Sequence, residues 1–267
     1  MFMNVSGQRV VVVTGAAAGI GAAVAAELAP GARALALWDR DPRVHRVAAE
    51  IAAQSPCSVA AAEVDVTDAK SVAAAFDGLV AEHGVPDVVA HAAGVMREGS
   101  ALEVSADQWD ESLAVNATGT MHVTQCAARE MVAAGRGAIV VVSSNAASTP
   151  RVGMAAYCAA KAAATAFTRA LALQVAPHGV RVNLVSPGST DTAMLRGMYA
   201  DDAGPLDDAA RTAVLDGDAH AYRLGIPLRR IATAADIAAA VRFLASEDAR
   251  HITMHDLRVD GGATLDM

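Results

Sequence analysis

A run of four valines followed by a glycine-rich turn constrains the fold of this chain more than any other segment. Residues 10–13 are all valine and end at Thr14, as expected for a strand buried on both faces of a parallel sheet. Gly15, Gly19 and Gly21 fall at the junction between this strand and a helix predicted over 20–29. Such glycines let the backbone turn tightly and approach a pyrophosphate, and the helix N-terminus supplies N–H donors. The segment predicts a dinucleotide-binding turn, although glycine-rich turns also occur where they serve packing alone.

The rest of the chain alternates between strand-like and helix-like segments. Further strands are predicted over residues 33–38, 58–64, 87–90, 138–143, 180–185 and 256–259. Helices are predicted over residues 42–54, 68–83, 105–134, 155–177 and 233–246. This alternation predicts an α/β fold of the Rossmann type: a doubly wound, seven-stranded parallel sheet with helices on both faces, formed by residues 1–267 as a single domain.

One long stretch, residues 189–227, reads as irregular. It includes an acidic segment with glycine and proline over residues 201–208. Insertions of this length in a compact domain are usually functional. We therefore expect this stretch to be a substrate lid over the active site.

Composition and charge argue against several classes of protein. With 267 residues, 54% of them hydrophobic, the chain can bury one large core. Its net charge of −8 and its lack of a basic block argue against a nucleic-acid-binding surface. No uncharged apolar run reaches about 18 residues and the first residues do not resemble a signal peptide, so we expect a cytoplasmic protein without membrane spans. The cysteines and histidines show no disulfide or metal-ligand spacing, so no metal site is expected.

Asp39 indicates which dinucleotide binds. It ends the second predicted strand, 18 residues after Gly21, where a carboxylate accepts hydrogen bonds from the adenosine ribose hydroxyls. The same carboxylate would repel a 2′-phosphate, and no lysine or arginine lies among residues 16–18 to offset it. NAD is therefore favoured over NADP, with Arg40 the opposing signal because an arginine here could contact a phosphate. Asp65, after the third strand, is expected to lie against the adenine, to cap a turn, or to do both.

Tyr157 and Lys161 form a candidate catalytic pair. They are four residues apart in a predicted helix, so both side chains lie on one face. An ammonium beside a phenol favours the phenolate and would lower the tyrosine pKa from about 10 towards neutrality. A tyrosine tuned in this way can take a proton from an alcohol while a nicotinamide takes the hydride. The alternative is a chance pair on an alanine-rich helix, and the glycine motif upstream argues against it.

Together these residues resemble the short-chain dehydrogenase/reductase family over essentially the whole chain. The resemblance rests on the glycine motif with Ile20, on Asp65, Val66, Ala93, Gly94, Asn116, Ser144, Tyr157 and Lys161, and on Pro187, Gly188, Thr190 and Thr192. It implies that Tyr157 is the general base, that Lys161 lowers the pKa of Tyr157 and binds the nicotinamide ribose, and that Ser144 holds the reacting oxygen. Asn116 is implied to order a proton-relay water, the alternative being a helix residue bonded to the backbone. The other residues of the motif are implied to contact the cofactor, and His91-Ala92 departs from the two asparagines usual in the family.

A narrower group within the family is also similar to this chain. Residues 149–154, 185–192, 224–228, 251–253 and 259–265 closely resemble 2,3-dihydro-2,3-dihydroxybenzoate dehydrogenases of catechol-siderophore biosynthesis. That resemblance implies NAD-dependent oxidation of the C3 alcohol of a dihydrodiol carboxylate, followed by tautomerisation to 2,3-dihydroxybenzoate. The family resemblance also implies a homotetramer. Three alternatives stay open: a dehydrogenase of another isochorismate-derived ring such as dihydro-hydroxyanthranilate, an NADPH-dependent ketoacyl reductase, and a non-catalytic NAD-sensing module.

A benzoate-like substrate requires a cation in its site. Arg97 and Arg151 lie on loops at the carboxyl ends of predicted strands, where open α/β sheets bind ligands. Either guanidinium could bind a carboxylate through two hydrogen bonds, and either could equally be an ordinary loop arginine. Met194, on the expected lid, is placed to cover the substrate ring or simply to pack.

Overall fold

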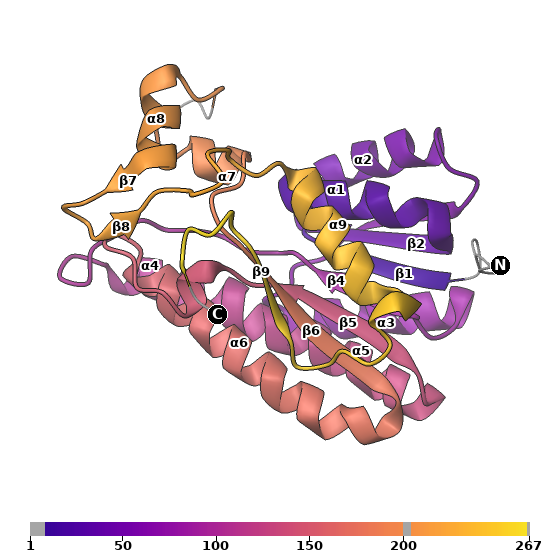
Figure 1. Cartoon of the computed structure of the whole chain (residues 1–267). Helices are drawn as coiled ribbons and strands as arrows, with labels where there is room; N and C mark the ends of the chain where they lie inside the picture. Colours follow the sequence, from indigo (N-terminus) through magenta and orange to yellow (C-terminus); the bar gives the residue numbers. More distant parts are fainter. Residues whose placement is uncertain (1–8, 200–203, 266–267) are drawn as a thin grey trace.

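β1 and β4 are neighbours in the middle of a seven-stranded sheet. The computed structural model describes residues 9–199 and 204–265. Seven parallel strands have the order β3-β2-β1-β4-β5-β6-β9, with helices on both faces (Figure 1). The strands are β1 (Arg9–Thr14), β2 (Ala32–Asp39), β3 (Ser58–Glu63), β4 (Val88–His91), β5 (Gly137–Val142), β6 (Val180–Pro187) and β9 (Asp256–Val259). The strand order reverses between β1 and β4, which is where such sheets form a ligand-binding crevice.

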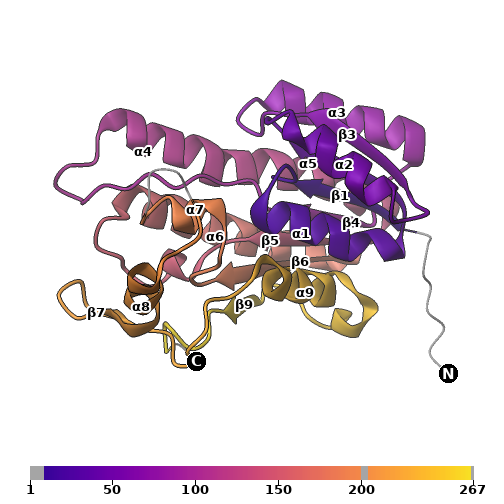
Figure 2. The same cartoon turned by 90° about the horizontal axis from the view of Figure 1, so that it is seen from above.

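Alternate valines of β1 enter two separate cores. Val11 and Val13 pack in one core with α1 (Gly19–Leu28), α2 (Arg43–Ala52) and α9 (Ala234–Ala245). Val10 and Val12 pack in the other with α3 (Ala69–His83), α5 (Gly119–Ala134) and α6 (Ala155–Val175). Figure 2 shows α1 and α9 side by side on their face of the sheet. The uninterrupted valine run therefore reflects a strand covered on both faces, as the sequence predicted.

The helix predicted over 105–134 consists of three consecutive elements. α4 (Ala106–Leu113) leads into a π-helical turn (Ala114–Thr118), and the turn leads into α5. Ser105 and Gln108 form a capping box at the start of α4, since each side chain accepts the backbone N–H of the other. π turns within helices often lie at functional sites. This one carries Asn116.

The segment expected to be irregular contains regular structure, so that part of the prediction is wrong. It includes α7 (Ala193–Arg196), α8 (Asp208–Asp216) and an antiparallel pair of short strands, β7 (Gly217–Asp218) and β8 (Arg223–Leu224). Figure 1 shows these elements grouped at one end of the molecule. They pack around a third cluster of buried residues: Leu195, Val214, Ile226, Ile231 and Ala263. Residues 201–203 of the acidic segment lie outside the described residues.

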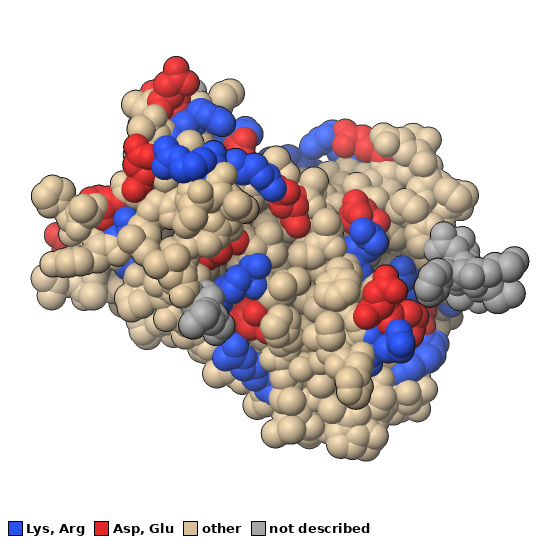
Figure 3. All heavy atoms as spheres, in the orientation of Figure 1, with Lys and Arg blue, Asp and Glu red and all other residues tan. Residues whose placement is uncertain are grey.

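The surface carries both signs of charge. On the face shown in Figure 3, basic side chains gather over the α7–α8 segment beside acidic ones, and that face has no broad basic area. Among the described residues, no helix is long and apolar enough to cross a membrane. Within those same residues, no group of three or more His, Cys, Asp or Glu side chains could hold a metal ion.

Candidate active site

A cavity of about 520 Å³ lies at the carboxyl ends of the central strands. Its wall brings together three of the predicted catalytic residues, Ser144, Tyr157 and Lys161. Residues predicted to contact the cofactor or substrate also line it: Ile20, Gly94, Arg151, Pro187, Gly188, Thr190, Thr192 and Met194. The structure therefore gathers into one cavity residues that lie more than 170 positions apart in the chain, from Ile20 to Met194.

Tyr157 and Lys161 lie one turn apart on α6 and are almost fully buried, with 8% and 5% of their surfaces exposed. The Lys161 Nζ donates to the carbonyl oxygen of Val142 at 3.0 Å and lies 5.8 Å from the centre of the Tyr157 ring. Burial lowers the pKa of Lys161 to about 8, so the lysine remains mostly charged at pH 7. The floor of the cavity thus combines a phenol with a nearby ammonium.

The pKa of Tyr157 differs from the sequence prediction. Burial raises the pKa of Tyr157 to about 12, and the hydrogen bond with the Ser144 side chain opposes that rise. The predicted lowering of the Tyr157 pKa towards neutrality is therefore wrong for the protein side chains alone. The free-energy cost of burying the phenolate exceeds the stabilisation that the neighbouring side chains provide. Ser144 also accepts the backbone N–H of Ala146 at 3.1 Å, which leaves its hydroxyl proton for another acceptor.

The turn that carries Ser144 is held from the end of the chain. Asn145, the next residue, donates through Nδ2 to the Asp260 carboxylate at 3.3 Å. The same carboxylate oxygen accepts the Thr264 hydroxyl at 2.7 Å, and the other accepts the Gly262 N–H at 2.9 Å. Asp260 therefore joins the segment after β9 to the turn that holds Ser144.

Asn116 clamps the loop after β4. Its Nδ2 donates to the carbonyl oxygens of Val95 and Ser112 at 2.8 and 3.0 Å, and its Oδ1 accepts the Val95 N–H at 3.2 Å. Both donors of the amide are used in this way, which matches the backbone-bonded alternative. The proton-relay role stays a prediction. The clamp fixes the position of Gly94, which lies between Asn116 and Lys161.

The glycine turn has the shape that a dinucleotide requires. Gly15 has φ of 68°, and a Cβ there would come within 2.6 Å of the Ala92 carbonyl carbon. A Cβ on Gly21 would collide with the carbonyl oxygen of Gly15, so neither position accepts a side chain. Thr192 lies across from Gly19, and the loop after β6 thus closes over the turn. These contacts fit a pyrophosphate held by backbone N–H groups at the start of α1.

Asp39 lies beside the glycine turn at the end of β2. Its Oδ2 accepts the Ala17 N–H and its Oδ1 accepts the Asp41 N–H, each at 3.0 Å. Each oxygen keeps a second lone pair that can accept a ribose hydroxyl, and the ribose contact stays a prediction. Arg40 is exposed next to it. Asp65 caps a turn by accepting the Thr67 N–H and hydroxyl, and the buried Val66 packs against Gly119.

Comparison with known proteins agrees with this geometry. A family model described as enoyl-(acyl carrier protein) reductase matches residues 15–264. The 2,3-dihydro-2,3-dihydroxybenzoate dehydrogenases of Bacillus subtilis and Escherichia coli are 39% and 38% identical to the chain, and each match covers 98% of this chain and 99% of the relative. The chain belongs to the short-chain dehydrogenase/reductase family. It is an NAD-dependent oxidoreductase that acts on a CH–OH group.

The fold of this dehydrogenase agrees with solved structures of the family. A short-chain dehydrogenase/reductase from Mycobacterium ulcerans superposes with a TM-score of 0.86 at 30% identity, covering 97% of this chain and 91% of that one. The match includes the doubly wound parallel sheet that the sequence predicted.

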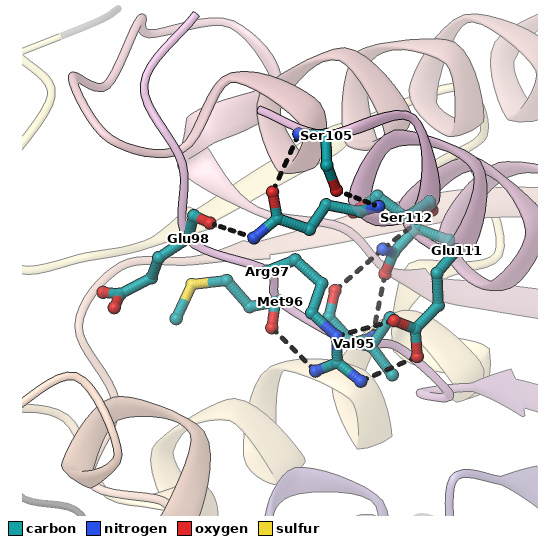
Figure 4. Close-up of polar contacts among 9 residues, drawn as sticks. Val95, Met96, Arg97, Glu98, Ser105, Glu111 and Ser112 are labelled. Atoms are coloured by element: carbon teal, nitrogen blue, oxygen red, sulfur yellow. Dashed lines mark hydrogen bonds and ion pairs between the residues drawn. The ribbon is translucent and has the colours of Figure 1, made fainter. Parts of the chain in front are cut away.

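The structure separates the two arginines that the sequence placed at the substrate. Arg97 is bound to Glu111 on α4 through Nε and Nη2, at 2.6 and 2.7 Å, and its Nη1 donates to the Met96 carbonyl at 3.2 Å (Figure 4). It does not line the cavity that holds Tyr157. Its Nε and Nη2 are occupied by Glu111, and the substrate role of Arg97 stays a prediction.

Arg151 instead lines the catalytic cavity of the dehydrogenase. Burial lowers its pKa, and the neighbouring charge of Arg223 lowers it further. Within the part of the chain that the structure describes, the Arg151 side chain has no hydrogen-bond or ion-pair partner. Arg223, on β8, lines the same cavity and was not predicted, because its segment had been interpreted as irregular.

His91, where the family usually has asparagine, is fully enclosed at the end of β4. Its Nδ1 is 2.8 Å from the Thr14 hydroxyl, and burial, with a smaller effect of Lys161, lowers its pKa to about 3. The ring is therefore neutral at physiological pH. The His91–Thr14 contact joins β4 to β1 beneath the cavity.

Proposed function

We propose that this dehydrogenase oxidises 2,3-dihydro-2,3-dihydroxybenzoate to 2,3-dihydroxybenzoate, in siderophore or related secondary-metabolite biosynthesis. The observation that carries the proposal is Arg151, a half-buried guanidinium without a described side-chain partner, in the same cavity as Tyr157 and Ser144. A ring carboxylate entering such a cavity needs a cation, because burying it unpaired is costly. The names of the relatives from B. subtilis and E. coli support the same substrate.

The residues of the cavity divide the work of an alcohol oxidation. Ser144, whose oxygen already accepts the Ala146 N–H, is proposed to turn its hydroxyl proton from the Tyr157 oxygen to the substrate oxygen. Tyr157, in its phenolate form, receives the alcohol proton as the C–O bond becomes a carbonyl. The Lys161 ammonium, 5.8 Å from the centre of the Tyr157 ring, is proposed to stabilise the phenolate. Bound NAD would supply the hydride acceptor for the same carbon.

The ring makes the reaction favourable in this direction. Loss of a hydride from C3 and a proton from its oxygen leaves a cyclohexadienone. The dienone then moves a ring proton to oxygen and becomes an aromatic catechol. Aromatisation removes the product from the back-reaction, which agrees with NAD as the cofactor of an oxidative step.

The direct test is turnover of a panel of candidate substrates by the purified protein, followed at the nicotinamide absorbance. NAD is the cofactor except where NADPH is named. The panel holds 2,3-dihydro-2,3-dihydroxybenzoate, its primary amide, a dihydro-hydroxyanthranilate and a β-ketoacyl thioester with NADPH. We expect the benzoate to have the highest kcat/KM. A higher value for the anthranilate or the thioester would contradict the proposal and assign the enzyme to that substrate.

Arg151→Ala tests the observation that carries the proposal. Losing a charge-assisted contact costs about 1.5–3 kcal/mol, which corresponds to roughly 10- to 150-fold. We expect the KM for the acid to rise by that factor, and the rise for the amide to be much smaller. Arg97→Ala is the matched comparison, since Arg97 is bound to Glu111. An equal loss on acid and amide would remove Arg151 from carboxylate recognition.

The segment 189–227 is proposed to act as a lid over the active site.

The enzyme is proposed to be a cytoplasmic homotetramer that binds neither nucleic acid nor membranes. Closed symmetry is the common arrangement for such assemblies. We expect residues 260–267 to lie in a subunit interface, and of these Asp266 and Met267 lie outside the described residues. Light scattering that gives a monomer mass at micromolar concentration would contradict the tetramer.

A further inference from the structure

Two arginines from distant parts of the chain face one cavity. Arg151 belongs to the loop before α6, and Arg223 belongs to β8 of the short hairpin in the lid segment. Both line the cavity that contains Tyr157. They are near enough for the charge of Arg223 to act on Arg151. Like charges placed together in a half-buried site cost free energy unless an anion lies between them.

The neighbours of Arg223 show that its arrangement is unusual for this segment. Arg196, Arg229 and Arg230 are each paired with an aspartate, at 2.6–2.7 Å. By contrast, the only hydrogen bond of the Arg223 side chain to a described residue runs from Nη2 to the Tyr199 hydroxyl and is 3.5 Å long. Most of its donors therefore remain available to a ligand in the cavity.

The two acidic residues of the cavity wall form no ion pair with Arg223 among the described residues. Asp218 is its cross-strand partner, but the Asp218 carboxylate accepts the backbone N–H groups of His220 and Ala221. Glu98, the other acidic residue of the wall, is exposed on the loop after β4. Neither carboxylate forms an ion pair with Arg223 among the described residues.

The hairpin is anchored where it meets α8. Ile226, directly after β8, is buried in the third cluster and donates its N–H to the Leu215 carbonyl at 2.9 Å. A Cβ on Gly225 would collide with the same carbonyl oxygen, so the chain passes α8 at close range. Gly217, at the start of β7, has φ of 80°, which a residue with a side chain rarely adopts. These contacts fix the start of the Arg223 side chain relative to the cavity.

We propose that Arg223 is a specificity residue that binds the substrate carboxylate together with Arg151. This inference rests on the proposed function and deepens it, because it divides one anion site between the body of the protein and the lid hairpin. An anion held by both guanidiniums removes their mutual repulsion, so its binding also favours the hairpin position seen here. A neutral ring gives no such gain, and the lid therefore selects for the acid.

The test measures binding rather than turnover. The probes are 2,3-dihydroxybenzoate and its neutral match 2,3-dihydroxybenzamide, titrated by calorimetry into the NAD-bound enzyme at pH 7. We expect Arg223→Gln to raise the Kd of the acid at least tenfold and to reduce the preference for acid over amide by a similar factor. Arg223→Lys keeps the charge but loses the planar fork of the guanidinium. We expect its Kd for the acid to lie between those of the wild type and Arg223→Gln. Arg211→Gln is the control, because Arg211 is an exposed arginine of α8 outside the cavity wall.

The outcomes separate this inference from the proposed function. An unchanged Kd for the acid in Arg223→Gln, or an equal loss of acid and amide affinity, would overturn the role of Arg223 even if the wild-type enzyme oxidises the diol. Selective loss of acid affinity in an enzyme that does not oxidise the diol would retain the two-arginine site and reject the proposed reaction.

Discussion

Ser144, Tyr157 and Lys161 lie on elements that pack into the two large cores, whereas Arg223 lies on a hairpin anchored by a cluster of five buried residues. The first region, the catalytic floor, comprises the turn after β5 and the start of α6. The second, the lid, is the described part of residues 189–227. The floor is buried and holds the groups proposed to move a proton, while the lid is more exposed and holds Arg223, proposed to recognise charge. The proposed catalytic residues are thus held by the two large cores, and the proposed substrate-recognition residue Arg223 by a small separate cluster.

The largest expected effect tests the floor. Tyr157→Phe keeps the packed ring and removes the proton acceptor, and a positioned acid or base typically contributes 10²–10⁴-fold, about 3–5 kcal/mol. We expect kcat to fall by that factor while the Kd for NAD, measured by fluorescence, stays near its original value. Near-normal kcat in the variant would show that the proton leaves by another route.

Lys161→Met tests whether the buried lysine lowers the free energy of unfolding of the protein. Lowering the Lys161 pKa from 10.5 to about 8 corresponds to about 3 kcal/mol of unfavourable burial, and the loss of its hydrogen bond to Val142 offsets about 1 kcal/mol of that. We expect the variant to be inactive but up to about 2 kcal/mol more stable than the wild type in urea at pH 7.

The advantage of Lys161→Met should shrink as the pH rises. Between pH 8 and about 10.5 the unfolded chain still binds the proton that the folded lysine has released, so wild-type stability rises through this window relative to the variant. Urea titrations of both proteins at pH 7 and pH 10 measure the change. A constant difference would mean that Lys161 is not destabilised by burial.

Cofactor choice depends on the turn beside β1 rather than on the floor or the lid. We expect the wild type to prefer NAD over NADP by at least tenfold in kcat/KM, about 1.4 kcal/mol. Asp39→Asn keeps an acceptor for the Ala17 N–H and removes the negative charge, so it should narrow the preference. Equal use of both cofactors by the wild type would show that the exposed Arg40 dominates.

The smallest expected effect tests the lid. Val214→Ala removes two methyl groups from the third cluster, a loss of about 1–2 kcal/mol in local packing. We expect the KM for the acid to rise by less than tenfold, with kcat and the Kd for NAD nearly unchanged. A fall in kcat as large as that in Tyr157→Phe would show that floor and lid are not separate supports.

The sequence predicts the floor better than the lid for a physical reason. The buried strands and long helices repeat their apolar pattern over several turns or residues, so their observed ends lie within one or two positions of the predicted ones. α7 is a single turn of four residues, and β7 and β8 have two residues each, which is too short for any periodicity. Their signals were local caps, such as Thr192 before α7 and Asp207 before α8.

The errors at the site share one cause, which is tertiary contact. The predicted lowering of the Tyr157 pKa counted a neighbour on the same helix and left out the burial that the assembled sheet imposes. The pairing of Arg97 with Glu111, on the following helix, is equally invisible to spacing. Arg223 was missed because nothing in its local sequence shows that the hairpin turns towards Arg151.

The link from Asp260 to the turn after β5 has a practical consequence for protein production. Because the Asp260 carboxylate bonds both Asn145 and Thr264, a fusion appended after the last residues would pull on the turn that positions Ser144. A purification tag is better attached ahead of β1. The first residue of β1 lies at the amino ends of the strands, and the cavity lies at their carboxyl ends. If a preparation with a C-terminal tag shows low activity, the protein should first be prepared again with an N-terminal tag. Only then should the assay conditions be changed.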